Sequence, residues 1–401
     1  MADIKRKVPN LRFKGFTDDW EQRKLGGLFS TITDYVANGS FKSLRDHVKT
    51  YDTPNYAYMI RLIDASNDWK GPWLYTDRNG YSFLRKTSLK TNDVLLSNVG
   101  AGVGKTFLVP NLDKPMTLAP NSVLLRSSLF NERYLFYLIN TCKNKNKILS
   151  MVGISAQPKL NKTDFKEVKV NTSLQKQEQL KIEETLSLIE NNITLQQRKL
   201  DLLKQLKKGL LQKMFADKDS KQPILRFKGF HDDWEQRKLG EVAEIKTGSR
   251  NHQDSVDNGK YPFFIRSEKV ERLNEYDFDT KAILVPGDGR IGEIFHYYDG
   301  KFALHQRVYK VDNFKEVNPL YLLNLFKYKF KKHALRLNAQ GTVPSLRLPM
   351  FTNWNILIPN LNEQQKIGLF FQQLDSLITL QQRKQNHLKL LKKSLLQQMF
   401  I

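Results

Sequence analysis

The heptapeptide Ile193-Thr-Leu-Gln-Gln-Arg-Lys199 occurs a second time in this chain, as Ile378-Thr-Leu-Gln-Gln-Arg-Lys384. The similarity extends at the same spacing over two longer segments, residues 178–215 and 363–400. A repeat of this length has to be identified before single elements are assigned, because it means that two parts of the chain share one fold. The chain is therefore interpreted as two related halves.

Both repeated segments predict a long helix with a coiled-coil seam. Apolar residues recur in alternating steps of four and three, and no proline interrupts the first segment. The seam residues are Ile182, Leu186, Ile189, Ile193, Leu200, Leu203, Leu210 and Met214 in the first helix, and Ile367, Phe371, Leu374, Ile378, Leu388, Leu395 and Met399 in the second. At roughly 35 to 40 residues, each helix spans on the order of 50 to 60 Å. A helical bundle would have short loops, so we interpret the helices as a spacer between two domains.

Polar residues interrupt the two seams at matching places. Gln196 and Lys207 lie in the first seam, and Gln381 and Lys392 occupy the same positions in the second. Matching seams predict that the helices pack on each other. A buried pair of Gln196 and Gln381 would fix the register of that packing at some cost in stability.

A second repeat precedes each helix, and the two copies are called the lead segments (residues 11–26 and 225–240). Between each lead segment and its helix lies a variable region in which β-branched and aromatic runs predict strands. The predicted strands are 57–63, 94–96 and 122–125 in the first half, and 263–265, 283–285 and 307–311 in the second. Asn131 and Asn318 each predict the start of a helix. Each variable region is thus expected to be a mixed α/β domain.

The charge of the chain points to a polyanionic partner. Its 401 residues include 65 Lys and Arg against 41 Asp and Glu, a formal net charge of +24. Such an excess is typical of nucleic-acid-binding proteins. An anionic membrane is the alternative, but no apolar run of about 18 residues is present. We therefore expect double-stranded DNA, and no membrane, as a partner.

Cysteine and histidine usage argues against disulfides and metal centres. Cys142 is the single cysteine, and the seven histidines include no close pair that would suggest a metal site. The first seven residues carry charges but no apolar core of a secretion signal. A cytoplasmic location is expected on this basis.

Three motifs suggest catalysis and fail in detail. The segment 97–106 resembles a phosphate-binding loop, but Val99 replaces the required first glycine, so a turn between two strands is favoured. Asn318-Pro-Leu-Tyr321 resembles an adenine methyltransferase signature, but no glycine-rich cofactor motif precedes it. Asp233, Glu244 and Lys246 have nuclease-like spacing that the first half does not share. We expect no enzyme and no cofactor in this chain.

The whole arrangement resembles the specificity subunit of type I restriction–modification systems. The resemblance rests on the duplicated Asp-Asp-Trp-Glu-Gln-Arg-Lys-Leu-Gly lead segments, the glycine-rich turns near 100–104 and 287–292, the segments Gly153–Leu160 and Gly341–Leu346, and the repeated helices. It implies two mixed α/β target recognition domains separated by two long antiparallel coiled-coil helices, with a pseudo-twofold internal repeat. The domains would span residues 1–173 and 217–360, and the helices 174–216 and 361–401.

The resemblance also implies partners. Each target recognition domain would recognise one half of a bipartite DNA sequence. Two modification subunits, which bind S-adenosylmethionine and methylate adenine, would dock on the helices, and restriction subunits using ATP and Mg²⁺ would join the full complex. If the helices are antiparallel, two domains about 34 Å apart can each enter a major groove and leave the base pairs between them unread.

Polar side chains on the loops of both domains are the candidates for DNA contact, because base edges are recognised by Arg, Asn, Gln, Lys, Ser and Thr. The candidates are Arg61, Ser97, Asn98, Lys105, Asn121, Gln157 and Lys159 in the first domain, and Ser249, Arg250, Asn251, Arg266, Arg290, Gln306, Arg307 and Gln340 in the second. Arg61 and Arg266 occur in both halves and are equally compatible with a framework role. An architectural coiled-coil DNA-binding protein without a methylation partner is the alternative function.

Overall fold

The computed structural model describes residues 7–153, 157–217, 220–338 and 344–401. The chain divides into two compact units, one formed by residues 1–195 and 385–401 and the other by residues 196–384. Each unit contains one α/β domain, the beginning of the long helix that follows this domain, and the end of the other long helix. The two halves are thus interleaved rather than consecutive.

Short strands and helices alternate in the α/β domain of the first unit. The strands are β1 (Glu21–Lys24), β2 (Thr31–Asp34), β3 (Thr50–Tyr51), β4 (Ala57–Ile60), β5 (Tyr75–Thr76), β6 (Ser88–Leu89), β7 (Val94–Ser97), β8 (Thr106–Leu108), β9 (Met116–Leu118), β10 (Ser122–Arg126) and β11 (Lys169–Thr172). The helices are α1 (Leu25–Leu28), α2 (Phe41–His47), α3 (Leu62–Ser66), α4 (Arg78–Phe83), α5 (Glu132–Asn140), α6 (Cys142–Leu149), α7 (Lys162–Glu167) and the start of α8 (Lys176–Met214), with 3₁₀ turns at Tyr35–Asn38 and Arg85–Thr87.

The central strands of this domain are apolar on both faces. Strand β10 lies between β2 and β7 in a four-stranded antiparallel sheet of order β2-β10-β7-β8. Alternate residues of a strand point to opposite faces. Accordingly Val94 and Val123 join the core beneath α5, while Leu95 and Leu124 join a second core with the five-stranded sheet β3-β5-β4-β9-β6. This double burial explains why β7 and β10 are nearly continuous apolar runs.

The domain of the second unit has fewer and longer strands. The strands are β12 (Glu235–Lys238), β13 (Glu244–Thr247), β14 (Tyr261–Phe264), β15 (Val270–Leu273), β16 (Phe278–Pro286), β17 (His296–Leu304), β18 (Val308–Asp312) and β19 (Asn355–Ile358). The helices are α9 (Leu239–Val242), α10 (Pro319–Leu325), α11 (Lys331–Leu337), α12 (Leu348–Thr352) and the start of α13 (Leu361–Gln398), with a 3₁₀ turn at His252–Asp254 and a π-helical turn at Phe326–Phe330.

A six-stranded sheet of order β13-β18-β16-β17-β14-β15 forms the second domain. Strand β16 alternates between two cores: Ile283 and Val285 pack with α10 and α11, and Ala282 and Leu284 pack with Phe302 on the other face. Since one face is covered by helices and the other by the sheet's own aromatic residues, this strand is also buried at both faces.

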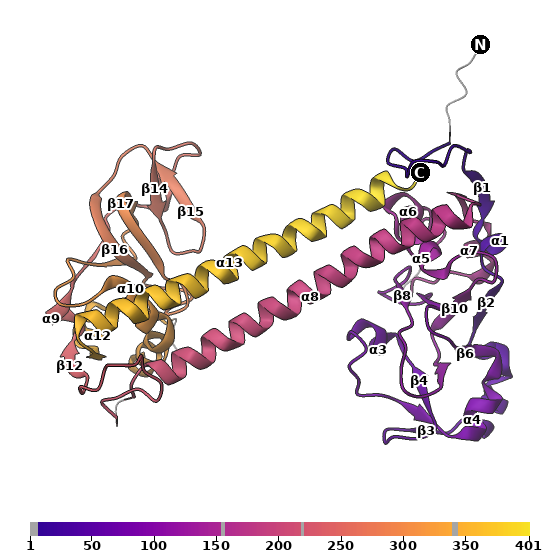
Figure 1. The fold of residues 1–401 in the computed structure, drawn as a ribbon, viewed down its shortest axis with the longest axis horizontal. Coiled ribbons are helices and arrows are strands. Elements are labelled where there is room, and N and C mark those ends of the chain that lie inside the picture. The colour runs from indigo at the N-terminus through magenta and orange to yellow at the C-terminus, as the bar shows by residue number, and fades with distance from the viewer. Residues whose placement is uncertain (1–6, 154–156, 218–219, 339–343) are drawn as a thin grey trace, which may run out of the picture. The chain divides into compact units, whose positions relative to one another are not determined.

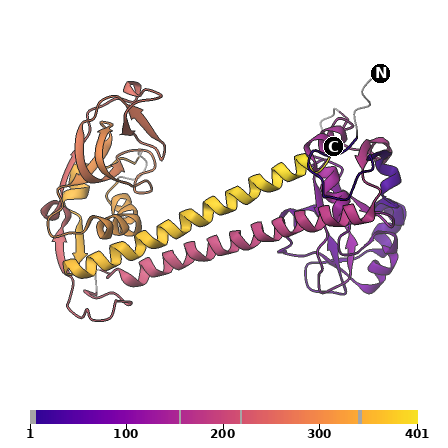
Figure 2. The same ribbon diagram turned by 45° about the horizontal axis from the view of Figure 1, so that its top comes forward.

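The long helices α8 and α13 lie side by side and antiparallel in each unit, as Figures 1 and 2 show. In the second unit Lys207 pairs with Asp375. In the first unit Lys392 pairs with Glu190. By the internal repeat, Lys392 corresponds to Lys207 and Asp375 corresponds to Glu190, so the two pairs are equivalent with the helices exchanged. This reciprocity is what a pseudo-twofold internal repeat produces, and it confirms the predicted packing.

The predicted polar seam pair is present within the second unit. The side-chain amide of Gln381 donates to the side-chain oxygen of Gln196 and, at 3.3 Å, to its backbone oxygen. Gln381 is buried. A pair of this kind is satisfied in one register only, so it fixes how α8 and α13 align.

Each lead segment places a tryptophan against the end of the helix from the other half. Trp20 contacts Phe400 edge to face, with ring centroids 5.9 Å apart. Trp234 contacts Phe215 in the same way at 6.4 Å. The repeated Met-Phe pair that ends each long helix is thereby explained, because it completes the core around the tryptophan.

Local predictions are confirmed with one correction. Asn131 and Asn318 cap α5 and α10 by accepting backbone N–H groups, as expected. The strand expected over residues 57–63 was wrong beyond Ile60. There Asp64 accepts the backbone N–H of Arg61 at 2.8 Å and starts helix α3, a local signal that outweighs the apolar run.

Candidate nucleic-acid interface

The first glycine turn (residues 97–105) joins strands β7 and β8, which confirms a turn between two strands over the phosphate-loop interpretation. Its ends are closed by Ser97 N–H to Lys105 O and Gly104 N–H to Ser97 O, both at 2.8 Å. Gly104 has a φ of +81°, where a β-carbon would be strained and would also meet Leu149 at 2.6 Å. The conformation of the turn is thus fixed by backbone hydrogen bonds and by the requirement for glycine at position 104.

Residues 157–160, which lie before α7, pack on this turn. Leu160 N–H donates to Asn98 O, and Gly100 N–H donates to Pro158 O, both at 2.9 Å. Val99 and Lys159 form an isolated β-bridge. The side chains of Lys105, Gln157 and Lys159 are exposed here. The structure therefore gathers these candidates, although they come from two separate stretches of sequence.

The other first-domain candidates are buried, located in a turn, or paired with neighbouring groups. Ser97 is buried, and Asn98 has a buried side-chain oxygen with no partner among the described residues. Asn121 is exposed, at a φ of +69° in the turn before β10. The guanidinium of Arg61 binds Asp64 at 2.7 Å and Pro72 O at 2.7 Å. Hydrogen bonding to Asp64 raises the pKa of Arg61, and the geometry supports the framework role considered for it.

The second glycine turn (residues 286–292) repeats the arrangement. Leu346 N–H donates to Gly287 O at 2.6 Å, and Asp288 forms an isolated β-bridge with Ser345. Gly287 N–H donates to Arg307 O at 2.7 Å. In both domains a leucine N–H from the later segment, Leu160 or Leu346, donates to a backbone oxygen of the glycine turn, so the two turns are structurally equivalent. Candidate Gln340 lies outside the described residues.

Two further loops of the second domain meet beside this turn. The backbone of Arg250 pairs with residues 304–306, and the side chain of Gln306 donates to Asn251 Oδ1 at 2.7 Å. Ser249, Asn251, Gln306 and Arg307 are exposed. Ser249 and Asn251 thus share one surface with Gln306 and Arg307, although more than fifty residues of sequence separate the two pairs.

Carboxylates hold most of the candidate arginines. Arg250 pairs with Asp277 and Glu275, both at 2.8 Å, and Arg266 pairs with Asp288 at 3.2 Å. Arg290 pairs with Glu293 at 2.8 Å and with Glu268 at 3.2 Å. The partners of Arg250 and Arg266, and Glu268 beside Arg290, lie at least 22 residues away in the sequence and leave no local pattern, whereas Glu293 is only three residues from Arg290. Within the described residues, the side chain of Arg307 has no such partner.

His305 lies buried beneath this surface. Its Nδ1 accepts the backbone N–H of Arg307 at 2.9 Å, which places the ring proton on Nε2. Burial, and then the positive charge of Arg266, lowers the pKa of His305. The neutral imidazole therefore fixes the backbone of residue 307 rather than adding charge to the surface.

Two kinds of site were not found in the described part of the chain: a cluster of metal ligands and a membrane-spanning helix. Over residues 7–153, 157–217, 220–338 and 344–401, no group of three or more His, Cys, Asp or Glu is arranged to hold a metal ion. Among the helices of the same ranges, none has both the length and the apolar character that a membrane span requires.

Comparison with known proteins identifies the domains. The family described as "Type I restriction modification DNA specificity domain" matches residues 17–205 and 231–390. The EcoDI specificity subunit of Escherichia coli is 31% identical over 147 residues, which cover 36% of this chain and 31% of that protein. The MjaVIII specificity subunit of Methanocaldococcus jannaschii is 24% identical over 387 residues, covering 84% of this chain and 86% of that protein.

A solved structure shares the fold. The type I restriction–modification S subunit from M. genitalium superimposes with a TM-score of 0.67 at 15% identity, covering 98% of this chain and 99% of that one. The match to the E. coli protein spans less than a third of that protein's length, whereas the M. jannaschii match spans most of both. The chain therefore belongs to the type I restriction modification DNA specificity domain family and carries the domain twice.

Proposed function

We propose that the chain recognises a bipartite DNA target, with the domain at residues 1–173 contacting one half-site and the domain at 217–360 the other. The observation that carries this proposal is the duplicated framework with unlike surfaces. Both units keep the glycine turn and its paired segment, but the exposed side chains around the turns differ. A single repeated surface would instead predict two copies of the same half-site.

Base contacts are assigned in this proposal to candidates whose side chains are exposed. Lys105, Gln157 and Lys159 on the first surface, and Gln306 and Arg307 on the second, extend from turns held by backbone hydrogen bonds. A rigid backbone with exposed polar side chains suits the recognition of base edges. Arg61, Ser97 and Asn121 are better explained by folding. The remaining basic surplus would contact phosphates.

The helices 174–216 and 361–401 set the distance between half-sites in this proposal. A pseudo-twofold relation between the two helices would match the twofold symmetry of the duplex. The reciprocal pairs Lys207–Asp375 and Lys392–Glu190 support that symmetry. Gln196 and Gln381 would keep the spacing constant by excluding other registers.

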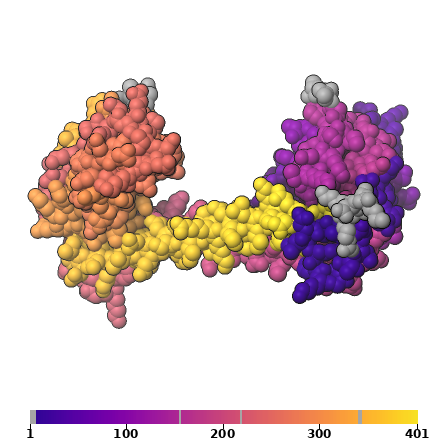
Figure 3. Space-filling view, turned by 90° about the horizontal axis from the view of Figure 1, so that it is seen from above, coloured from indigo at the N-terminus to yellow at the C-terminus, as the bar shows by residue number. Residues whose placement is uncertain are grey.

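Two modification subunits, we infer, dock on the outer faces of these helices. In the first unit Leu188 and Leu195 are exposed one heptad apart on α8, and in the second unit Leu202 and Leu206 continue with the same helical periodicity. Figure 3 shows the side chains of α13 (yellow) open on the molecular surface. Apolar side chains repeated at coiled-coil spacing are suited to binding partner helices.

The partners supply the chemistry in this proposal. The modification subunits would bind S-adenosylmethionine and methylate adenine, and restriction subunits with ATP and Mg²⁺ would complete the complex, in the cytoplasm. This chain would contribute DNA recognition and no cofactor. Its net charge of +24 supports a role on DNA.

One experiment tests the proposal as a whole. The chain is mixed with its co-expressed modification subunit, S-adenosylmethionine and genomic DNA, and methyl-adenine is then mapped by single-molecule sequencing. A split motif with unread bases between its halves is the expected result. No methylation, or methylation scattered without a motif, would overturn the proposal and favour the architectural DNA-binding alternative.

A further inference from the structure

The second unit contains an open groove between α10, α13 and strand β17, called here the α10–α13 groove. Its volume is about 510 Å³, and its walls include Tyr297, Leu320, Asn324, Asp375, Thr379 and Leu380. A second hollow of about 550 Å³ shares Tyr297 and Leu320 with it. The groove thus continues along α13, and its size lies within the range of protein binding sites.

A buried polar atom lies in the wall of this groove. Asn324 is only 2% exposed, and its Nδ2 donates to Leu320 O at 2.8 Å. Its Oδ1 is buried with no hydrogen-bond partner among the described residues. Buried acceptors of this kind almost always have a donor in folded proteins. The side chain therefore indicates a donor that the described residues of the second unit do not provide.

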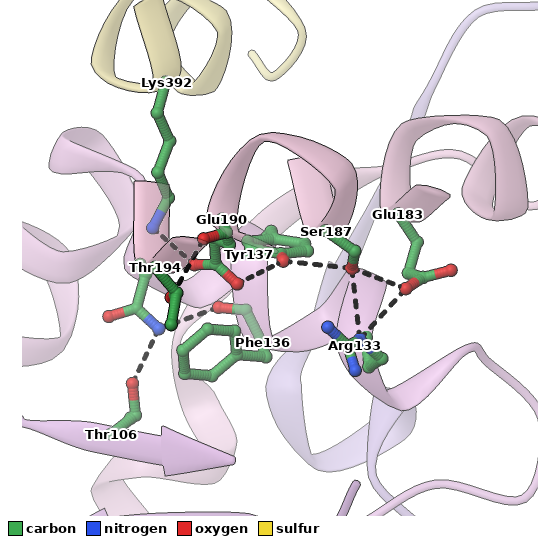
Figure 4. A network of polar contacts seen from close by, with 10 residues as sticks. Thr106, Arg133, Phe136, Tyr137, Glu183, Ser187, Glu190, Thr194 and Lys392 are labelled. Atoms are coloured by element: carbon green, nitrogen blue, oxygen red, sulfur yellow. Dashed lines mark hydrogen bonds and ion pairs between the residues drawn. The ribbon is translucent and has the colours of Figure 1, made fainter. Parts of the chain in front are cut away.

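The first unit shows what fills the equivalent place. Helices α5 and α10 align at their caps, Asn131 and Asn318, so Tyr137 corresponds to Asn324. Figure 4 shows Tyr137 inside a polar network on α8: its hydroxyl donates to Glu190 at 2.7 Å and lies 3.2 Å from Ser187 Oγ. Tyr137 is buried, and its ring occupies the space between α5 and α8.

A second side chain closes the first unit's network. Arg133, which corresponds to Leu320, donates to Ser187 at 3.2 Å and pairs with Glu183 at 2.9 Å. Gly368 takes the place of Glu183 in the second unit. Both the phenol and the guanidinium that seal the first unit are therefore replaced by smaller or apolar residues in the second.

The walls that receive the phenol are nevertheless retained. By the helix repeat, Glu190 corresponds to Asp375 and Ser187 to Gln372, and both Asp375 and Gln372 line the α10–α13 groove. Thr194 likewise corresponds to Thr379. The second unit thus keeps polar groups at these positions while lacking the aromatic residue. Asp375 is paired there with Lys207 and Lys327, so Asn324 Oδ1 is the acceptor that remains without a donor among the described residues. The phenol of Tyr137 in the first unit therefore shows which chemistry suits this position between the two helices.

We propose that the α10–α13 groove receives an aromatic side chain with a hydrogen-bond donor, such as tyrosine, from the modification subunit. The inference rests on the proposed docking of that subunit. A protein occupant is favoured because exposed Leu369, Leu377 and Leu380 follow the same helix beside the groove at helical spacing. Together they form an apolar rim that an aromatic anchor and its flanking helix would cover.

Two substitutions test the groove from different positions. Asn324→Tyr places the first unit's own residue in the groove, and Thr379→Trp fills it from an exposed position of α13. Asn258→Tyr, on an exposed loop outside the groove, adds the same side chain as a matched control. Binding of the full chain to the purified modification subunit is measured without DNA, by titration and sedimentation. Both groove variants are expected to raise Kd at least tenfold, and the control to leave it unchanged.

The outcomes separate the two proposals. Unchanged Kd in Thr379→Trp, with normal binding by the parent chain, would overturn the groove assignment and leave the docking proposal standing. Failure of the parent chain to bind the modification subunit would instead overturn the docking proposal. If Asn324→Tyr lowers the melting temperature, Thr379→Trp alone decides, because its side chain lies on the surface.

Discussion

Arg12 and Glu178 are joined by two hydrogen bonds, of 2.6 and 3.0 Å, between the first lead segment and the start of α8. Glu178 is fully buried and also accepts the indole N–H of Trp20 at 3.2 Å. Hydrogen bonding to this carboxylate raises the pKa of Arg12. Arg226 and Glu363 repeat the arginine–glutamate pair in the second unit, with both distances 2.7 Å, but the indole N–H of Trp234 has no hydrogen-bond partner among the described residues. In each unit, the lead segment therefore supplies the arginine and the start of a long helix supplies the glutamate of one buried ion pair.

Replacing Glu178 by Gln should destabilise the first unit by about 3 kcal/mol, because removing one partner of a buried pair leaves the other charge uncompensated. Urea unfolding followed by tryptophan fluorescence measures the effect, since Trp20 contacts the same carboxylate. Glu184→Gln, at an exposed position of the same helix, is the control and should change stability by less than about 0.5 kcal/mol. Equal stabilities of the two variants would contradict a structural role for the pair.

The seam amides predict a non-additive result. Gln381→Leu should lower stability by about 1 kcal/mol, because it leaves the amide of Gln196 without its partner. The double variant Gln196→Leu, Gln381→Leu should recover this loss or exceed the parent, since an apolar seam has no unpaired amide. Thermal unfolding of the four proteins gives the coupling energy as a double-mutant cycle. Additive changes would show that the two amides act independently.

Much of the architecture is predictable from sequence because periodicity and repetition are global signals. The repeat located both long helices, observed at Lys176–Met214 and Leu361–Gln398, and it indicated the pairing of Gln196 with Gln381. Strands buried on both faces, such as β7 and β16, were found from their apolar runs. The exception at Arg61 shows the limit, because a capping carboxylate three residues later outweighed the run.

Acid should weaken the helix pair in the second unit through Asp375. Burial is the largest influence and acts to raise the pKa of Asp375, but Lys207 and Lys327 together outweigh it, so this pKa is lowered. A lowered carboxyl pKa means that the unfolded chain takes up the proton first as pH falls. The stabilisation is therefore complete above the ordinary Asp pKa of about 4 and is lost as pH falls through the lower, folded value.

The comparison of the parent with Asp375→Asn isolates this contribution. Melting temperatures are measured between about pH 6 and pH 2, where the other carboxylates titrate alike in both proteins. The parent should be more stable at the upper end, and the difference should shrink toward the lower end. A difference that stays constant across the range would show that Asp375 does not gain stability from ionisation.

The surface of the recognition domains was only partly predictable. Arg250, Arg266 and Arg290 were predicted to contact DNA because arginine is a residue type that recognises base edges. Apart from Glu293, which lies three residues after Arg290, their carboxylate partners come from other loops and become visible only when the sheet brings them together. Residue type thus indicates what a side chain can bind, whereas the fold determines whether its donors are already occupied.

Arg307 and Arg250 should consequently differ when each is replaced by Ala. Arg307 is exposed and has no ion-pair partner within the described residues, so Arg307→Ala should weaken binding to the target duplex about tenfold and leave the melting temperature unchanged. Arg250→Ala should lower the melting temperature, because Arg250 ties its loop to Asp277 and Glu275. Hydrogen bonding to Asp277 also raises the pKa of Arg250, so the charge is held in place.

Fluorescence anisotropy with the complex of this chain and its modification subunit measures both effects, using the mapped target and a duplex with one half-site scrambled. The weaker binding of Arg307→Ala should be confined to the duplex that carries the second domain's half-site, since a base contact affects only its own sequence. If Arg307→Ala weakens both duplexes equally, the residue contacts phosphate and not a base. If Arg250→Ala changes neither stability nor binding nor site preference, Arg250 has neither role.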